Sequence, residues 1–228
     1  MKPFKSTLLS GTVITAAMVA AGILTGSELM DANASEPRAV AVNPCAAKNP
    51  CNPCNPCAAA AEVELTSAEA ASAYGCLSAA MQTGYKKSGD KYAAAYSTWK
   101  IYNTRPYTSG THGGRFVNNY ANAKAKAYGR YERAGKLPAG PVLAKDSFAV
   151  QPNGRTAAGP LFLMEKMHSG FSKASANWRY TLIMPSGQTV GMTNGKGSNN
   201  VKFCAECHIS VAEEEDSMLL LPEEVRRN

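Results

Sequence analysis

Histidine, tryptophan and long apolar runs are scarce in this sequence of 228 residues, which has three histidines and two tryptophans. Beyond the N-terminal region, no stretch is apolar enough to span a bilayer. No basic cluster is interleaved with aromatic residues, so nucleic acid is not an expected partner. The net charge of +7 favours acidic partners or anionic surfaces, or simply accompanies a soluble basic protein. The acidic run at residues 213–216 is interpreted as a solvated helix start, with docking of a basic partner as the alternative.

The single long apolar run, residues 8–24, lies behind Lys2 and Lys5 and is followed by a small-x-small site at residues 32–34. This order is typical of an export signal. We therefore predict that residues 1–34 are removed on export to the periplasm and that the mature chain has no membrane span. An uncleaved anchor is the alternative, but the run is short for a span and is interrupted by polar residues.

Four Asn-Pro-Cys units occupy residues 43–57, with the sequence NPCAAKNPCNPCNPC. Each proline removes a backbone donor and disfavours helical geometry in the preceding Asn. We therefore predict a structureless linker over residues 35–61, ahead of a single folded domain over residues 62–228. Thiols at CxxC spacing can also form disulfides or hold a soft metal ion. The cysteines concerned are Cys45, Cys51, Cys54 and Cys57.

The first part of the folded domain is expected to be helical. An Ala-rich stretch over residues 62–87 has Thr66 or Ser67 as a cap, which predicts a helix. A second helix is expected over residues 118–134, where Gly135 would end it.

Two patterns in this region predict buried side chains. Cys76, inside the first expected helix, is interpreted as a small buried residue. An aromatic series at spacings of three and four is typical of a core-facing stripe. Its members are Tyr92, Tyr96, Trp99 and Tyr102.

From residue 142 the apolar pattern alternates at period two, which is typical of strands. Strands are expected at residues 142–150, 161–167 and 177–184, with turns at residues 152–154 and 185–187. Successive strands joined by hairpin-like turns favour an antiparallel sheet. The expected fold class is therefore α+β, a sheet-dominated domain preceded by helices.

Near the C-terminus, the sequence FCAECH contains Cys204, Cys207 and His208 in Cys-x-x-Cys-His spacing. Two cysteines at this spacing form thioethers to the haem vinyl groups, and the adjacent His binds the iron from one face. We therefore predict one covalently attached haem c with His208 as iron ligand. A zinc site would need further ligands nearby, and neither other histidine is close in sequence to a cysteine. A redox-active CxxC would belong to a thioredoxin-like βαβ pattern, which is absent.

The other face of the iron is expected to be open. An axial Met would block external ligands, but only Met218 follows His208 in the chain. The upstream methionines lie on expected strands or turns, where Met is usually core filler. His112 is either a distal base or a loop residue, and the two glycines after it favour a surface loop. His168, beside a Ser-Gly pair, is interpreted in the same way.

Four segments carry a resemblance to a known family. AYGRYERAGKLPAGPVLAKDSFAV (residues 127–150), GPLFLMEKM (159–167), NWRY (177–180) and FCAECH (203–208) resemble, in order and spacing, the cytochrome P-460 family, which includes the cytochromes c′-beta. The resemblance implies a sheet-dominated haem protein, usually dimeric, with a proximal His and an open distal face. Catalytic members oxidise hydroxylamine with an external electron acceptor and carry a lysine covalently joined to a haem meso carbon. The matching residue here is Lys145.

Lys145 also calls for a physical explanation. If its strand face lines the core, an unpaired buried charge would be costly, whereas on an exposed edge a lysine simply discourages aggregation. Hydroxylamine oxidation must also release protons, for which a pocket carboxylate is the obvious acceptor. No Asp or Glu occurs between Glu165 and Glu206. Asp146 and Glu165 remain as candidates, although Asp146 alternates away from Lys145 on the expected strand.

Two functions of different classes follow. The first is an exported haem enzyme that oxidises hydroxylamine or a related small nitrogen species, with Lys145 bonded to the haem, a periplasmic cytochrome as electron acceptor and a homodimeric assembly. The second is a non-catalytic protein that binds nitric oxide and resembles cytochrome c′-beta, which the shortage of carboxylates favours. A simple electron carrier would need a Met on the iron.

Overall fold

The computed structural model describes residues 64–227. The predicted export signal and the predicted Asn-Pro-Cys linker, with Cys45, Cys51, Cys54 and Cys57, lie outside the described residues. Within the described range, no helix has the length and apolar character needed to cross a membrane.

The first helix, α1, runs from Ser67 to Lys86, within the range expected for it. The Thr66 hydroxyl accepts a hydrogen bond from the Glu69 amide, and the Glu69 carboxylate accepts one from the Thr66 amide. This reciprocal capping box satisfies two amides at the helix start. Cys76 is exposed rather than buried as predicted, because it lies outside the buried stripe of the helix. That stripe includes Ala73, Leu77, Met81 and Tyr85.

The aromatic stretch after α1 packs as predicted but is only partly helical. Its elements are α2 (Lys91–Ala95), the 3-10 turn η1 (Tyr96–Thr98) and the short strand β1 (Lys100–Ile101). Tyr96 and Tyr102 are fully buried, and Tyr92 and Trp99 pack half-buried against the core.

The predicted helix over residues 118–134 is wrong. Its first part belongs to strand β3 (Arg115–Ala121), which pairs with strand β2 (Tyr107–Ser109) across the turn η2 (Gly110–His112). Its second part, η3 (Ala123–Arg133), consists of 3-10 turns broken at Tyr131, which has a φ of 53°. Pairing of β3 with neighbours on both sides satisfies its backbone and overrides the local helix propensity of this stretch.

The remaining strands join β1, β2 and β3 in one antiparallel sheet, as predicted. They are β4 (Val142–Val150), β5 (Thr156–Ala158), β6 (Leu161–Lys166), β7 (Trp178–Ile183) and β8 (Thr189–Met192). The main path runs β1-β3-β4-β6-β7-β8, with β2 beside β3 and β5 beside β4. The class is therefore α+β, with helices ahead of a sheet-dominated domain, and the sheet includes short strands that the period-two pattern did not reveal.

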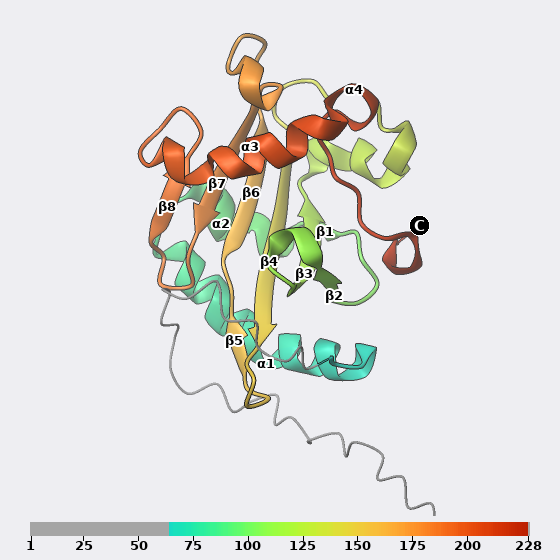
Figure 1. The fold of residues 1–228 in the computed structure, drawn as a ribbon, viewed down its shortest axis with the longest axis vertical. Helices are drawn as coiled ribbons and strands as arrows, with labels where there is room; N and C mark the ends of the chain where they lie inside the picture. The colour runs from blue at the N-terminus through green and yellow to red at the C-terminus, as the bar shows by residue number, and fades with distance from the viewer. Residues whose placement is uncertain (1–63, 228) are drawn as a thin grey trace, which may run out of the picture. The chain divides into compact units, whose positions relative to one another are not determined.

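Each face of the sheet has its own covering (Figure 1). α1 and α2 pack on one face, against a core cluster that includes Phe148, Leu161 and Ile183. α3 crosses the other face, where a second cluster includes Leu143, Tyr180 and Met218. The C-terminal part comprises η4 (Lys173–Ser175), η5 (Ser198–Val201), α3 (Lys202–His208), η6 (Ile209–Val211), α4 (Ala212–Glu215) and η7 (Glu223–Val225).

The carboxylate of Asp146 is buried in the core between the sheet and α1. It is 0% exposed, and its carboxylate accepts hydrogen bonds from the hydroxyls of Tyr74 at 2.7 Å and Tyr96 at 3.1 Å and from the amide of Asn118 at 3.2 Å. Burial raises the pKa of Asp146 from 3.8 to about 6, although these hydrogen bonds oppose the shift. The central strand β4 therefore carries a titrating group in the acidic range.

Asp146→Asn should remove an acid-range slope from the stability of the protein. Because the pKa of Asp146 is raised in the folded state, the folded protein keeps a proton between pH 3.8 and about 6 that the unfolded protein releases. The protonated carboxyl therefore adds to the free energy of unfolding below pH 3.8, and this contribution is lost as the pH rises through about 6. We expect the free energy of unfolding, measured in denaturant across this range, to lose that slope in Asp146→Asn. The exposed Glu214→Gln variant should keep it, and a slope that persists in Asp146→Asn would contradict the assignment.

Candidate haem-binding site

A cavity of about 410 Å³ lies between α3 and the sheet. Its walls come from α3, from strands β3, β4, β6 and β7, and from the turn η2. Cys204, Cys207 and His208 line it from α3, and Lys145 lines it from β4. The fold thus brings the Cys-x-x-Cys-His motif and the lysine together from distant parts of the sequence.

His208 is held in the form that binds a metal ion. Its ring is 7% exposed, and Nδ1 donates a hydrogen bond to the carbonyl oxygen of Ser217 at 2.7 Å. Since a carbonyl only accepts, the proton is on Nδ1 and Nε2 keeps its lone pair. Burial lowers the pKa of His208 to about 4, so the imidazole is neutral at pH 7. A neutral imidazole with a fixed tautomer is the usual histidine ligand.

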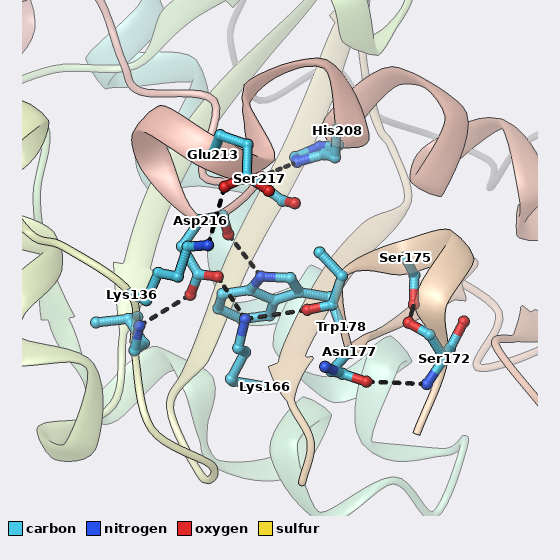
Figure 2. Close-up of polar contacts among 12 residues, drawn as sticks. Lys136, Lys166, Ser172, Ser175, Asn177, Trp178, His208, Glu213, Asp216 and Ser217 are labelled. Carbon is cyan, nitrogen blue, oxygen red and sulfur yellow. Dashed lines mark hydrogen bonds and ion pairs between the residues drawn. The ribbon is translucent and has the colours of Figure 1, made fainter. Parts of the chain in front are cut away.

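The carbonyl that orients this imidazole belongs to a turn with an unusual backbone. Asp216 and Ser217 have φ values of 49° and 64°, in the left-handed region that non-glycine residues rarely adopt. Asp216 is anchored by three donors. Figure 2 shows two of them: Lys166 Nζ reaches its carboxylate at 2.5 Å, and Trp178 Nε1 reaches its carbonyl at 2.6 Å. The Leu137 amide also donates to the carboxylate, at 2.9 Å. We call residues 216–217 the proximal turn, because these anchors hold the Ser217 carbonyl against the histidine.

The proximal turn corrects one interpretation of the acidic run. Glu213 and Glu214 are exposed, as a solvated helix start requires. Asp216 is instead 2% exposed and forms a buried ion pair with Lys166. The sequence pattern did not separate it from its neighbours, because the partner lies on β6 and becomes adjacent only in the folded chain.

Lys145 points into the cavity from a central strand, not from an exposed edge. It pairs in register with Asn119 on β3 and with Phe162 on β6, both of which also line the cavity. Burial lowers the pKa of Lys145 to about 8, although the nearby Cys207 opposes the shift. A substantial fraction of the amine is therefore neutral in mildly alkaline solution, and a neutral amine is a nucleophile.

The two carboxylates considered as proton acceptors lie elsewhere. Asp146 is on the opposite face of β4, in the network with Tyr74 and Tyr96. The Glu165 carboxylate accepts a hydrogen bond from the Tyr92 hydroxyl at 2.6 Å and pairs with Arg179 at 3.0 Å. Both have structural partners, and neither lines the cavity.

His112 lines the cavity, which differs from the predicted surface loop. Its ring centre is 4.8 Å from that of Phe162 and 6.5 Å from that of His208. Gly113 has a φ of 74° and does form a turn, as its sequence predicts, but the β2–β3 hairpin folds this turn over the cavity. A strand predicted after Gly113 and Gly114 would have indicated the β2–β3 hairpin and therefore the position of His112. His168, in contrast, is exposed as predicted.

The residues that line the cavity fit a haem. Its volume lies within the range of about 300–1,000 Å³ typical of cofactor sites. The Cys204 and Cys207 thiols are free, and Arg115 offers a positive charge suited to the haem carboxylates. The Tyr180 hydroxyl is buried without a hydrogen-bond partner among the described residues, so it is available to form a hydrogen bond with a bound group. The apolar wall includes Leu143, Phe162, Met164, Leu182, Phe203 and Met218.

The fold and the cavity together define a class of protein: an antiparallel sheet with a cavity that fits a haem, closed by a short helix bearing two thiols and a neutral imidazole. The family model for cytochrome P-460 matches residues 93–218, more than half of the chain and a range that contains all eight strands and α3. The chain therefore belongs to the cytochrome P-460 family and is a haem protein. No match is found among curated proteins.

Lys166→Met tests the anchoring of the proximal turn. Removing the ammonium leaves the buried Asp216 carboxylate without its charged partner, so we expect the free energy of unfolding to fall by about 3–5 kcal/mol. Lys136→Met is the matched control, because the pair of Lys136 with Glu213 is exposed (Figure 2) and should contribute less than about 1 kcal/mol. Denaturant unfolding of the haem-loaded protein measures both, and equal losses would contradict the structural role of the buried pair.

Proposed function

We propose that this protein is an exported c-type haem protein that oxidises hydroxylamine or a related small nitrogen species and passes the electrons to a periplasmic cytochrome. One observation carries the proposal: Lys145 lies in the same cavity as Cys204, Cys207 and His208. A lysine charge is costly to bury in a largely apolar wall. Its position is accounted for if the amine acts on the group that the cavity holds, as the family resemblance implies for this residue.

In this proposal each residue of the site has a separate role. Cys204 and Cys207 would hold one haem c by adding their thiols across its vinyl groups, and Nε2 of His208 would hold the iron. The haem, when bound, supplies a redox-active iron that accepts small ligands. Lys145 would be joined to the macrocycle by an N–C bond that replaces an amine N–H and a meso C–H, with the two electrons and two protons passed to an oxidant such as a peroxide. The apolar side chains around them exclude water from the reacting centre, which strengthens the electrostatic interactions inside.

A second function, nitric oxide binding without catalysis, is favoured by a specific feature of the cavity. None of the described residues that line it is Asp or Glu. Oxidation of hydroxylamine releases protons and benefits from a carboxylate acceptor, whereas binding of nitric oxide releases none. The alternative would be a protein that resembles cytochrome c′-beta.

The cellular setting and the assembly are parts of the same proposal. The basic and apolar N-terminal segment supports export, and the division into signal, linker and haem domain follows from it. The net charge of +7 suits an acidic redox partner. Phe203 and Ile209, which are 55% and 39% exposed, lie on and next to α3 and suit contact with that partner or with the second subunit of a homodimer.

Lys145→Ala should separate the two functions by spectrum and mass. If Lys145 is bonded to the haem, the reduced wild-type protein has a broadened, red-shifted Soret band, and its digest contains a haem peptide with both Lys145 and Cys204. Both features should be lost in Lys145→Ala and kept in the exposed control Lys126→Ala. An ordinary c-type spectrum with no linked peptide in the wild-type protein would exclude the bond and favour nitric oxide binding.

Turnover provides the direct test of oxidation. We expect added hydroxylamine to reduce a soluble c-type cytochrome only in the presence of the haem-loaded protein, and the rate to fall at least about tenfold in Lys145→Ala, as for loss of a group that acts on the reacting centre. Lys126→Ala should retain the wild-type rate. Nitric oxide binding with no hydroxylamine-dependent reduction would overturn the enzymatic proposal.

A further inference from the structure

Two histidines from unrelated parts of the fold line the same cavity. His208 comes from the end of α3, and His112 comes from the turn η2 between β2 and β3. Their ring centres are 6.5 Å apart, and their ring planes are inclined by 72°. His112 is in contact with Phe162 on the cavity wall, so it lies inside the site and not at its outer rim.

In both imidazoles Nδ1 is held by an oxygen of the protein, a carbonyl for His208 and two hydroxyls for His112. Nδ1 of His208 is bonded to the Ser217 carbonyl at 2.7 Å. Nδ1 of His112 is 2.8 Å from the Ser109 hydroxyl and 3.2 Å from the Thr111 hydroxyl. In each ring the nitrogen left without a protein partner among the described residues is Nε2. Metal-binding histidines typically show this pattern, with one ring nitrogen held by an outer partner and the other on the metal.

The separation of the rings agrees with a shared metal ion. Two imidazoles on opposite sides of one ion, each with a metal–nitrogen distance of about 2 Å, have ring centres about 6 Å apart. A histidine that only contacted an external ligand on the iron would have to lie farther away, because the ligand needs room between them. The observed 6.5 Å leaves no such room.

We propose that His112 is the second axial ligand of the haem iron in the resting protein, bound through Nε2 opposite His208, and that a small nitrogen ligand must displace it. The inference rests on the haem of the proposed function but replaces a permanently open distal face with one that a protein side chain occupies until a ligand arrives.

The hairpin that carries His112 suits a displaceable ligand. β2 pairs only with β3 among the described strands, so η2 lies at the margin of the sheet and not in its centre. Gly113 and Gly114 have φ values of 74° and 64°, a conformation that glycine adopts without strain. Ser109 is buried and aims the ring. The histidine is thus oriented by the hydroxyls of Ser109 and Thr111 and carried by a short turn followed by two glycines.

Other cavity side chains are weaker candidates for this position. Met218 is 1% exposed and packed in the core cluster beneath α3, and Met164 packs against the same cluster. Lys145 emerges from the middle of β4 and is the residue for which the proposed function has another role. Among the described residues of the cavity, His112 combines a ring centre 6.5 Å from that of His208 with a nitrogen, Nε2, that has no partner there.

The test is the spin state of the iron in the purified haem-loaded protein without added ligand. We expect absorption and electron paramagnetic resonance spectra of the ferric wild-type protein to be low-spin and six-coordinate. His112→Ala should lose this signal and become high-spin, and added imidazole should restore it, which also shows that the variant is folded. His168→Ala is the matched control, because His168 is exposed and outside the cavity, and it should stay low-spin.

Ligand binding supplies a second readout. Because His112 and nitric oxide would compete for the same position on the iron, removing His112 should raise the apparent affinity for nitric oxide by about tenfold or more. A high-spin wild-type protein, or a low-spin signal that persists in His112→Ala, would overturn the inference. The outcome is independent of turnover: a His112-dependent low-spin signal without hydroxylamine oxidation retains the ligand and rejects the enzyme, and the reverse result rejects the ligand and retains the enzyme.

Discussion

The hydrogen bond from Nδ1 of His208 to the Ser217 carbonyl is the interaction on which the rest of the site depends. It fixes the tautomer, and with it the direction of the free nitrogen. The carbonyl is held in place by a turn that would be strained in isolation, and the turn is held by the buried pair of Lys166 and Asp216. A buried ion pair contributes little net stability, but here it specifies a backbone conformation. The proximal side of the haem site is therefore built from β6 and the C-terminal segment as much as from the Cys-x-x-Cys-His motif.

Strand β4 carries two ionisable side chains on opposite faces of the sheet, Asp146 and Lys145. Successive residues of β4 point to opposite faces, so Asp146 enters the core under α1 while Lys145 enters the cavity under α3. Burial acts on both and in opposite directions, raising the pKa of the acid and lowering that of the amine. The acid has three hydrogen-bond donors around it and is structural. The amine has no such set, which agrees with a role toward the bound group.

The parts of the fold that sequence reasoning found are those with a local signal. The capping box at Thr66 marks the start of α1, and alternation over residues 142–150 marks β4, since both patterns arise within a few residues of chain. The helix expected over residues 118–134 failed because cross-strand pairing outweighs local propensity there. His112 and Asp216 were misjudged for a related reason: their neighbours in sequence are turn-forming or acidic, but their partners in space are His208 and Lys166.

The sequence by itself predicted a haem-attachment motif, because the spacing of Cys204, Cys207 and His208 is local. It also determined the α+β class through two distinct periodicities. Alternation also placed Lys145 on a strand, and the family resemblance singled it out as the residue that acts on the haem. Only the tertiary structure decided which groups line the cavity: that Lys145 enters it, that no carboxylate from the described residues does, and that the ring of His112 lies 6.5 Å from that of His208. These are contacts between segments far apart in the chain. Their geometry is set by strand register and packing, which no short stretch of sequence contains.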